Sequence, residues 1–151
     1  MNTKSARIAY LAAALAAQFP ARGITRSFRM HSERDDSELT PGLFTVLSNG
    51  VADYPYEHSD YGPGLDAPVQ TELGALQLII TGQIKLAEGG EGEAVETAEL
   101  DMLADLEAFA NAAIADEQLV TLRLLSARQS AQLDTPYGWI HTEWLLPLLE
   151  V

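Results

Sequence analysis

The chain has 151 residues, of which 47% are hydrophobic, and its formal net charge at pH 7 is −13. This composition predicts one soluble globular domain, spanning residues 1–151, and excludes wholesale disorder. The sequence has no cysteine, which excludes disulfides and thiolate chemistry, and its acidity argues against the basic footprint that nucleic-acid binding needs.

The first element is a helix, predicted over residues 3–19. Ile8, Leu11, Leu15 and Phe19 recur at helical spacing, and Pro20 marks the end of the helix. The alanine-rich run at 11–17 is too short and too weakly apolar for a secretion signal. No stretch approaches the roughly 20 apolar residues of a membrane span. We therefore expect a cytoplasmic protein without a membrane segment.

Two short strands and a long loop follow. Residues 24–31 predict a strand with one solvated face, residues 32–41 a polar loop, and residues 43–47 a strand ended by the turn signal at 48–50. Residues 51–69 contain three tyrosines, three prolines and two glycines without any hydrophobic period. A long irregular loop of this kind is usually functional, and its tyrosines suit contact with another protein.

The clearest strand is predicted over residues 71–86, where apolar and polar residues alternate. We expect Gly82 to mark a bulge or a bend within it. A flexible acidic turn is expected at 87–94, and a second helix at 97–116. Acids in the first half of this helix suit the positive end of the helix dipole.

The last two strands are predicted over residues 119–127 and 137–146, and Pro147 favours an edge position for the final one. The element order is therefore α-β-β-β-α-β-β. Long strands joined by short turns predict an α+β fold, with a mainly antiparallel twisted sheet and two helices packed on one face.

The chemistry-bearing residues form no catalytic pattern. The sequence has no GxSxG elbow, and the glycine-rich stretch at 89–92 lacks the lysine of a phosphate loop. The acids occur in solvated runs. We therefore predict a protein that is not an enzyme and has no catalytic residues, cofactor site or metal site.

The three histidines are candidate metal ligands. His58 lies near Glu57 and Asp60, whereas His31 and His141 stand alone in the sequence. None has the spacing of a helical metal motif, which favours structural histidines. The enzyme alternative is a metal-assisted hydrolase built on His58, Asp60 and His141.

Six segments together carry a family resemblance. They are the opening helix TKSARIAYLAAALAAQF, the strand LFTVLSNG, the long strand ELGALQLIITGQIKLA, the helix ETAELDMLADLEAFANAAI and the closing pair LVTLRLLSAR and GWIHTEWLLPLLEV. In the order and length of these segments the chain resembles the tail terminator (minor tail) proteins of long-tailed bacteriophages. The resemblance covers most of the chain and contains no diagnostic motif.

The resemblance implies a structural role in a virion. Proteins of that family form a hexameric ring on the tail tube, stop its polymerisation and present the surface that joins the head. It therefore implies other copies of the chain, a tail-tube protein and a head-connector protein as partners. The expected location is the host cytoplasm during assembly and then the virion tail.

The uneven charge indicates how such a ring closes. Residues 1–31 carry five Lys or Arg and no acid, whereas residues 32–118 carry nineteen acids and two basic residues. A ring needs two different surfaces that meet head to tail. The interface candidates are Arg22, Arg26 and Arg29 on the basic side and Glu96, Glu99 and Asp101 on the acidic side. The candidates for contact with the tube or connector are Tyr54, Tyr56, His58 and Tyr61.

Other interpretations stay open at this point. The chain fits another head–tail connector or tail component, although two helices argue mildly against a tail-tube subunit. A non-viral small-ligand-binding or regulatory domain is the alternative from a different class, with the tyrosine-rich loop as the lid of its pocket.

Overall fold

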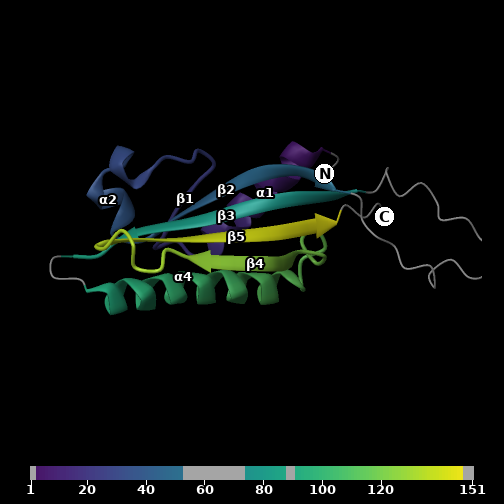
Figure 1. The fold of residues 1–151 in the computed structure, drawn as a ribbon. Coiled ribbons are helices and arrows are strands. Elements are labelled where there is room, and N and C mark those ends of the chain that lie inside the picture. Colours follow the sequence, from purple (N-terminus) through teal and green to yellow (C-terminus); the bar gives the residue numbers. More distant parts are fainter. Residues whose placement is uncertain (1–2, 53–73, 88–90, 148–151) are drawn as a thin grey trace, which may run out of the picture.

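The computed structural model describes residues 3–52, 74–87 and 91–147, and these form an α+β fold around a five-stranded sheet. In spatial order the strands are β1 (Gly23–Thr25), β2 (Leu43–Ala52), β3 (Ala75–Lys85), β5 (Tyr137–Pro147) and β4 (Arg123–Gln129). The sheet is mixed, because β1 pairs with β2 in parallel and the other pairs are antiparallel (Figure 1). The expected antiparallel arrangement is therefore matched only in part.

The first helix, α1 (Lys4–Gln18), forms where the apolar spacing predicts it. The Thr3 hydroxyl caps it by accepting a hydrogen bond from the Ala6 amide at 3.0 Å. Its buried residues are Ile8, Leu11 and Leu15, one stripe at three- and four-residue spacing.

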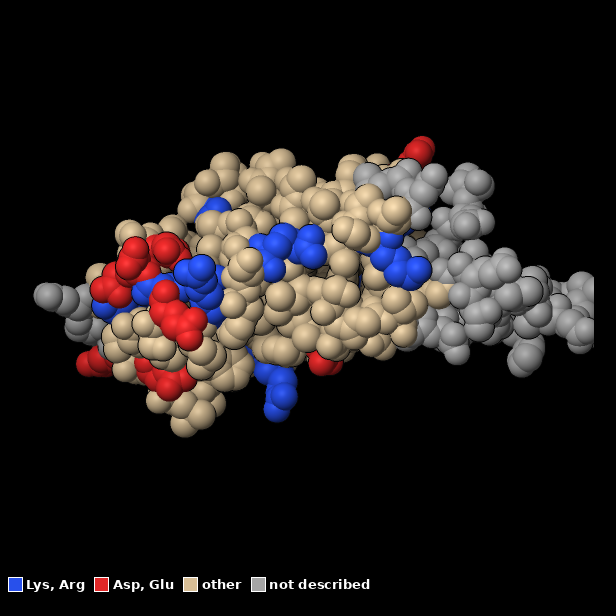
Figure 2. Space-filling model, turned by 90° about the horizontal axis from the view of Figure 1, so that it is seen from above, with Lys and Arg blue, Asp and Glu red and all other residues tan. Residues whose placement is uncertain are grey.

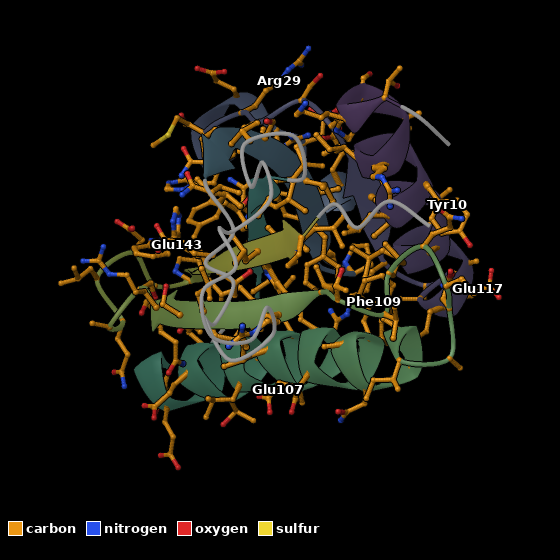
Figure 3. The ribbon with its side chains drawn as sticks, turned by 90° about the vertical axis from the view of Figure 1, so that its right-hand side faces the viewer. Tyr10, Arg29, Glu107, Phe109, Glu117 and Glu143 are labelled. Carbon is orange, nitrogen blue, oxygen red and sulfur yellow. The ribbon has the colours of Figure 1, made fainter. Side chains whose placement is uncertain are left out.

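The long helix α4 (Gly92–Ala113) shares a single core with α1. Met102, Leu106 and Phe109 of α4 belong to the same buried cluster as the apolar stripe of α1. Phe109 lies between α4 and the sheet in Figure 3, which looks along the strands. The helix begins at Gly92, five residues before the expected start at residue 97. Residues 92–94, which were expected in the acidic turn, therefore belong to the helix.

The strands β2, β3 and β5 present alternate residues to this core. Phe44, Gly82 and Ile140 lie side by side across them in an unbroken register. The prediction of a bulge at Gly82 is therefore wrong. The register shifts lie elsewhere, between Ser48 and Val51 of β2 and between Leu124 and Ser126 of β4.

The N-terminal strand is much shorter than the expected 24–31, because the chain leaves the sheet after Thr25. The carbonyl groups of Ser27 and Arg29 accept hydrogen bonds from the side chains of Arg34 and Gln83, so they do not join the strand ladder. The expected loop at 32–41 contains two short helices, η1 (His31–Glu33) and α2 (Asp36–Leu39).

Three further strand predictions change. The β2 strand continues through the expected turn at 48–50, with a bulge there. The β4 strand begins at Arg123 instead of residue 119. The β5 strand is internal, because β3 and β4 pair with its two sides, so the edge position expected from Pro147 is wrong. Of the expected loop at 51–69, residues 51 and 52 belong to β2 and the rest lies outside the described residues.

Candidate subunit interface

The two long helices carry charges of opposite sign. The charged residues of α1 are Lys4 and Arg7, both basic, whereas α4 carries six acids and no Lys or Arg. The first turn of α1 has no acid, and basic side chains there face the positive end of the helix dipole, which is unfavourable. Helix stability therefore does not explain the basic character of α1.

The basic candidates divide into one partly buried ion pair and two exposed side chains. Arg22 Nε lies 2.6 Å from Asp105 Oδ2 of α4, and the Arg22 side chain is 17% exposed. It joins two elements of the same chain, which withdraws its charge from the surface. Arg26 and Arg29 are exposed, although Arg26 Nε also donates to the carbonyl oxygen of Val46 at 3.0 Å. We call Arg26 and Arg29 the basic surface.

The acidic candidates divide in the same way. Glu99 is 1% exposed, and its carboxylate accepts hydrogen bonds from the Ser130 hydroxyl, the Trp139 amide at 2.9 Å and Gln129 Nε2 at 3.2 Å. Glu99 is therefore an internal acceptor, and its expected place at a subunit interface is corrected. Glu96 and Asp101 are exposed on the same helix.

The exposed acids of α4 form an acidic surface on the side of the molecule away from Arg29. Its members are Glu93, Glu96, Asp101 and Glu107. In the view along the strands, Arg29 and Glu107 project from opposite sides of the molecule (Figure 3). A head-to-tail contact joins opposite sides of neighbouring copies, so this arrangement suits a contact between unlike charges.

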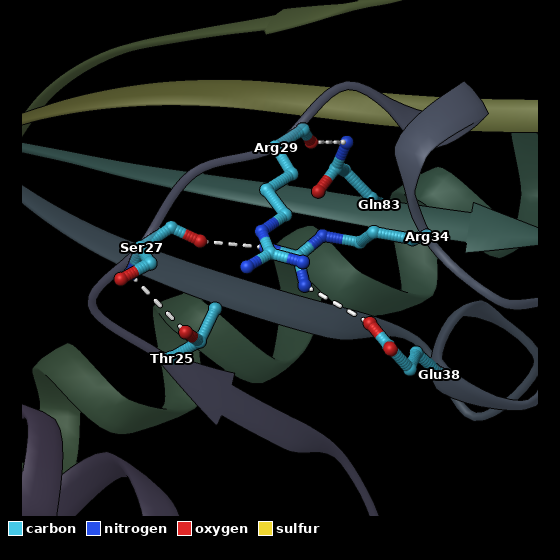
Figure 4. A network of polar contacts seen from close by, with 6 residues as sticks. All are labelled: Thr25, Ser27, Arg29, Arg34, Glu38 and Gln83. Atoms are coloured by element: carbon cyan, nitrogen blue, oxygen red, sulfur yellow. Dashed lines mark hydrogen bonds and ion pairs between the residues drawn. The ribbon is translucent and has the colours of Figure 1, made fainter.

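The segment that carries the basic surface is held on the sheet by polar contacts (Figure 4). Arg34 donates to the Ser27 carbonyl oxygen at 2.6 Å and to Glu38 at 3.0 Å, and Gln83 Nε2 donates to the Arg29 carbonyl oxygen at 2.9 Å. Residues 26–34 therefore form a strap across β3. The strap places Arg26 and Arg29 at the surface, and no periodic pattern in the sequence predicts it.

The two acids of α2, Asp36 and Glu38, lie beside basic groups. Lys85 Nζ is 2.5 Å from Asp36 Oδ2, and this carboxylate raises the pKa of Lys85 above its ordinary value. Figure 2 shows acidic and basic side chains mixed at the end that carries α2, and separate basic side chains along the rest of that face. Pairing with Arg34 and Lys85 thus reduces the acidity of this end.

A second feature that the sequence did not predict is a set of exposed apolar residues on β4 and in the segments that precede and follow it, here called the apolar border. Ile114, Val120, Leu125 and Leu133 are all exposed, and Leu133 is 80% exposed. The β4 strand lies at the edge of the sheet, and β5 is its one pairing partner within the described ranges. Exposed apolar side chains beside an open strand edge are typical of a surface that contacts another protein.

The remaining candidates do not come together in a described site. Tyr54, Tyr56, His58 and Tyr61 lie outside the described residues, as does Asp60. His141 is on β5, with Nε2 3.8 Å from Glu143 Oε1. Within the described part of the chain, no three His, Asp or Glu residues are grouped as a metal site, and no helix has the length and apolarity to span a membrane.

Comparison with known proteins adds no relative: the sequence matches no family model and has no significant match among curated proteins.

Proposed function

We propose that this chain is a structural protein of a bacteriophage virion, a tail terminator whose copies form a ring on the tail tube. The observation that carries the proposal is the opposite charge of Arg29 and the α4 acids on opposite sides of the molecule (Figure 3). In a ring, each copy meets its neighbours through two different surfaces. The basic surface of one copy would face the acidic surface of the next.

The apolar border beside β4 supports the same proposal. Charge complementarity chiefly sets the orientation and the rate of association, whereas burial of apolar area supplies most of the affinity. Val120 is 48% exposed and precedes β4, and Leu125 is 54% exposed and lies on β4, which is an edge strand of the sheet. Their burial between copies would stabilise a contact that the charges orient.

The proposal extends to partners and location. Besides its own copies, the chain would contact a tail-tube protein, whose polymerisation it stops, and a head-connector protein. It would assemble in the host cytoplasm and remain in the virion tail. An acidic ring would repel DNA and let it slide through the lumen without binding.

The test is a pair of charge-reversed variants, Arg26→Glu/Arg29→Glu and Glu96→Lys/Asp101→Lys. Size-exclusion chromatography with light scattering, at low salt, is expected to give six copies for the unchanged chain. Each variant alone brings like charges together and should remain monomeric. An equimolar mixture restores unlike charges at every contact of an alternating ring, so the oligomer should return.

The controls separate the contact from the fold. Lys4→Glu reverses an exposed charge at the start of α1, which belongs to neither charged surface and not to β4, and should leave assembly unchanged. Arg29→Glu alone keeps the Arg26 contact with Val46 if the double variant is unstable. Variants that assemble as well as the unchanged chain, or an unchanged chain that stays monomeric at low salt, would contradict the proposal.

A further inference from the structure

The buried polar atoms that lack a partner gather in one layer of the molecule. Over the described residues they are Arg34 Nε, Thr45 Oγ1, Thr81 Oγ1 and Gln83 Oε1. Thr45 and Thr81 are paired across β2 and β3, and Gln83 lies further along the same face of β3. The strap at 26–34 covers this face, with Gln83 bonded to Arg29 (Figure 4). A buried polar group without a partner is destabilising, so the concentration of four in one layer calls for a physical cause.

A hollow of about 280 Å³ adjoins these groups on the outer face of the sheet. Phe28 and Met30 of the strap line it on one side, and Trp139 and His141 of β5 line it on the other. Thr81 and Gln83 of β3 also line it. A cavity of roughly 150 Å³ is enough to hold benzene, so this hollow has room for a substituted aromatic ring.

The polar groups of the hollow specify the chemistry of its ligand. Gln83 is 5% exposed and Thr81 is 8% exposed. Because Gln83 Nε2 donates to the Arg29 carbonyl oxygen, the amide cannot turn over without placing oxygen against oxygen. Its Oε1 atom is therefore held as an acceptor that needs a donor. Among the described residues no Lys or Arg lines the hollow, and Asp134 does, so an anionic ligand would meet a charge of its own sign.

We propose that this hollow binds an aromatic ring that carries a hydrogen-bond donor, either a phenol or an indole. The ring would pack against Phe28 and Trp139, and its O–H or N–H group would donate to Gln83 Oε1. Thr81 lines the same hollow, and its hydroxyl, which has no partner, would bond the same polar group. The strap carries both the basic surface and part of the hollow, but the charge-reversed residues do not line the hollow, so different variants test the two proposals.

The first measurement is an NMR titration of the full chain with p-cresol and with toluene, which has the same ring without the hydroxyl. The indole N–H signal of Trp139 should shift and saturate, whereas that of Trp144, which is buried in the core, should not. We expect p-cresol to bind at least fivefold more tightly than toluene. Equal affinities, or no saturable shift with either compound, would overturn the proposal.

Two matched variants separate ligand binding from packing. Thr81→Val and Thr45→Val each remove a buried hydroxyl without a partner, so neither should lower the melting temperature. Thr81 lines the hollow and Thr45 does not. Thr81→Val should weaken p-cresol severalfold and leave toluene unchanged, and Thr45→Val should change neither. An effect of Thr45→Val equal to that of Thr81→Val would contradict a site at the hollow.

A third compound distinguishes the source of the ring. N-acetyl-tyrosinamide carries the same phenol within a peptide backbone. Tighter binding than p-cresol identifies the natural ligand as a tyrosine side chain of a partner protein. Weaker binding identifies a free small molecule, because the backbone groups would then obstruct entry. Either result supports the phenol chemistry of the site.

Discussion

Glu99 illustrates how the role of a charged residue depends on its surroundings. Its neighbours in the sequence, Glu96 and Asp101, are exposed, whereas Glu99 accepts three hydrogen bonds beneath β5 and the end of β4. Gly138 permits this approach, because a Cβ atom at that position would lie 3.0 Å from Glu99 Oε2. The carboxylate therefore joins α4 to the sheet.

We predict that Glu99→Ala lowers the free energy of unfolding by about 3 kcal/mol, because it leaves buried donors without an acceptor. Urea unfolding measures the change. The matched control is Glu96→Ala on the exposed side of the same helix, with an expected change within about 0.5 kcal/mol. Similar losses in both variants would contradict the internal role of Glu99.

At the scale of elements, side chains of α4 and β5 pack directly onto Gly82 of β3. A Cβ atom at Gly82 would lie 2.8 Å from Met102 of α4 and 2.8 Å from Ile140 of β5. Such distances are shorter than van der Waals contact. The glycine is thus required by the packing of helix on sheet, and not by a bend of the strand.

We predict that Gly82→Ala destabilises the fold by about 2 kcal/mol, because the added methyl group forces the helix and the strand apart. Thermal or urea unfolding measures the loss. The comparison variant is Gly92→Ala at the start of α4, where the nearest atom is the end of the flexible Gln132 side chain. There the expected change is below about 1 kcal/mol, since alanine favours a helix. A harmless Gly82→Ala would show that the packing is looser than described.

At the scale of the whole molecule, polar contacts join segments far apart in the chain. The Tyr10 hydroxyl of α1 donates to Asp116 Oδ2 beyond the end of α4, at 2.6 Å, and Arg22 pairs with Asp105 in the middle of α4. The Asp116 carboxylate raises the pKa of Tyr10, because ionisation of the phenol would break this hydrogen bond and place two negative charges together. Lys85 has a raised pKa beside Asp36.

These two shifts predict loss of stability at alkaline pH. A raised pKa in the folded state stabilises the protein below the ordinary pKa, here 10.0 for Tyr10 and 10.5 for Lys85. The stabilisation disappears as the pH rises through the folded value. The free energy of unfolding should therefore fall above about pH 10, and Tyr10→Phe should make that fall shallower. Urea unfolding at pH 8, 10 and 11 tests this, and an unchanged alkaline slope in Tyr10→Phe would contradict it.

The sequence by itself determined the elements whose pattern is local. The stripe of α1, the alternation of β3 and the spacing of Leu106 and Phe109 on α4 predicted their own burial, because each pattern repeats within a few residues. Leu100 belongs to the same helical pattern but is 45% exposed. For the candidate interface, the exposed Arg26, Arg29, Glu96 and Asp101 followed from the charge distribution.

Only the tertiary structure decided which charges stay at the surface. Glu99 is buried because its donors come from residues 30 to 40 positions later, and Arg22 is withdrawn by an acid 83 positions later. The strap at 26–34 leaves the strand ladder because the side chain of Gln83, 54 positions after Arg29, donates a hydrogen bond to the backbone carbonyl oxygen of Arg29. Contacts between residues so far apart in the chain produce no repeating pattern in the sequence. Which residues meet depends on which strands and helices the fold brings together.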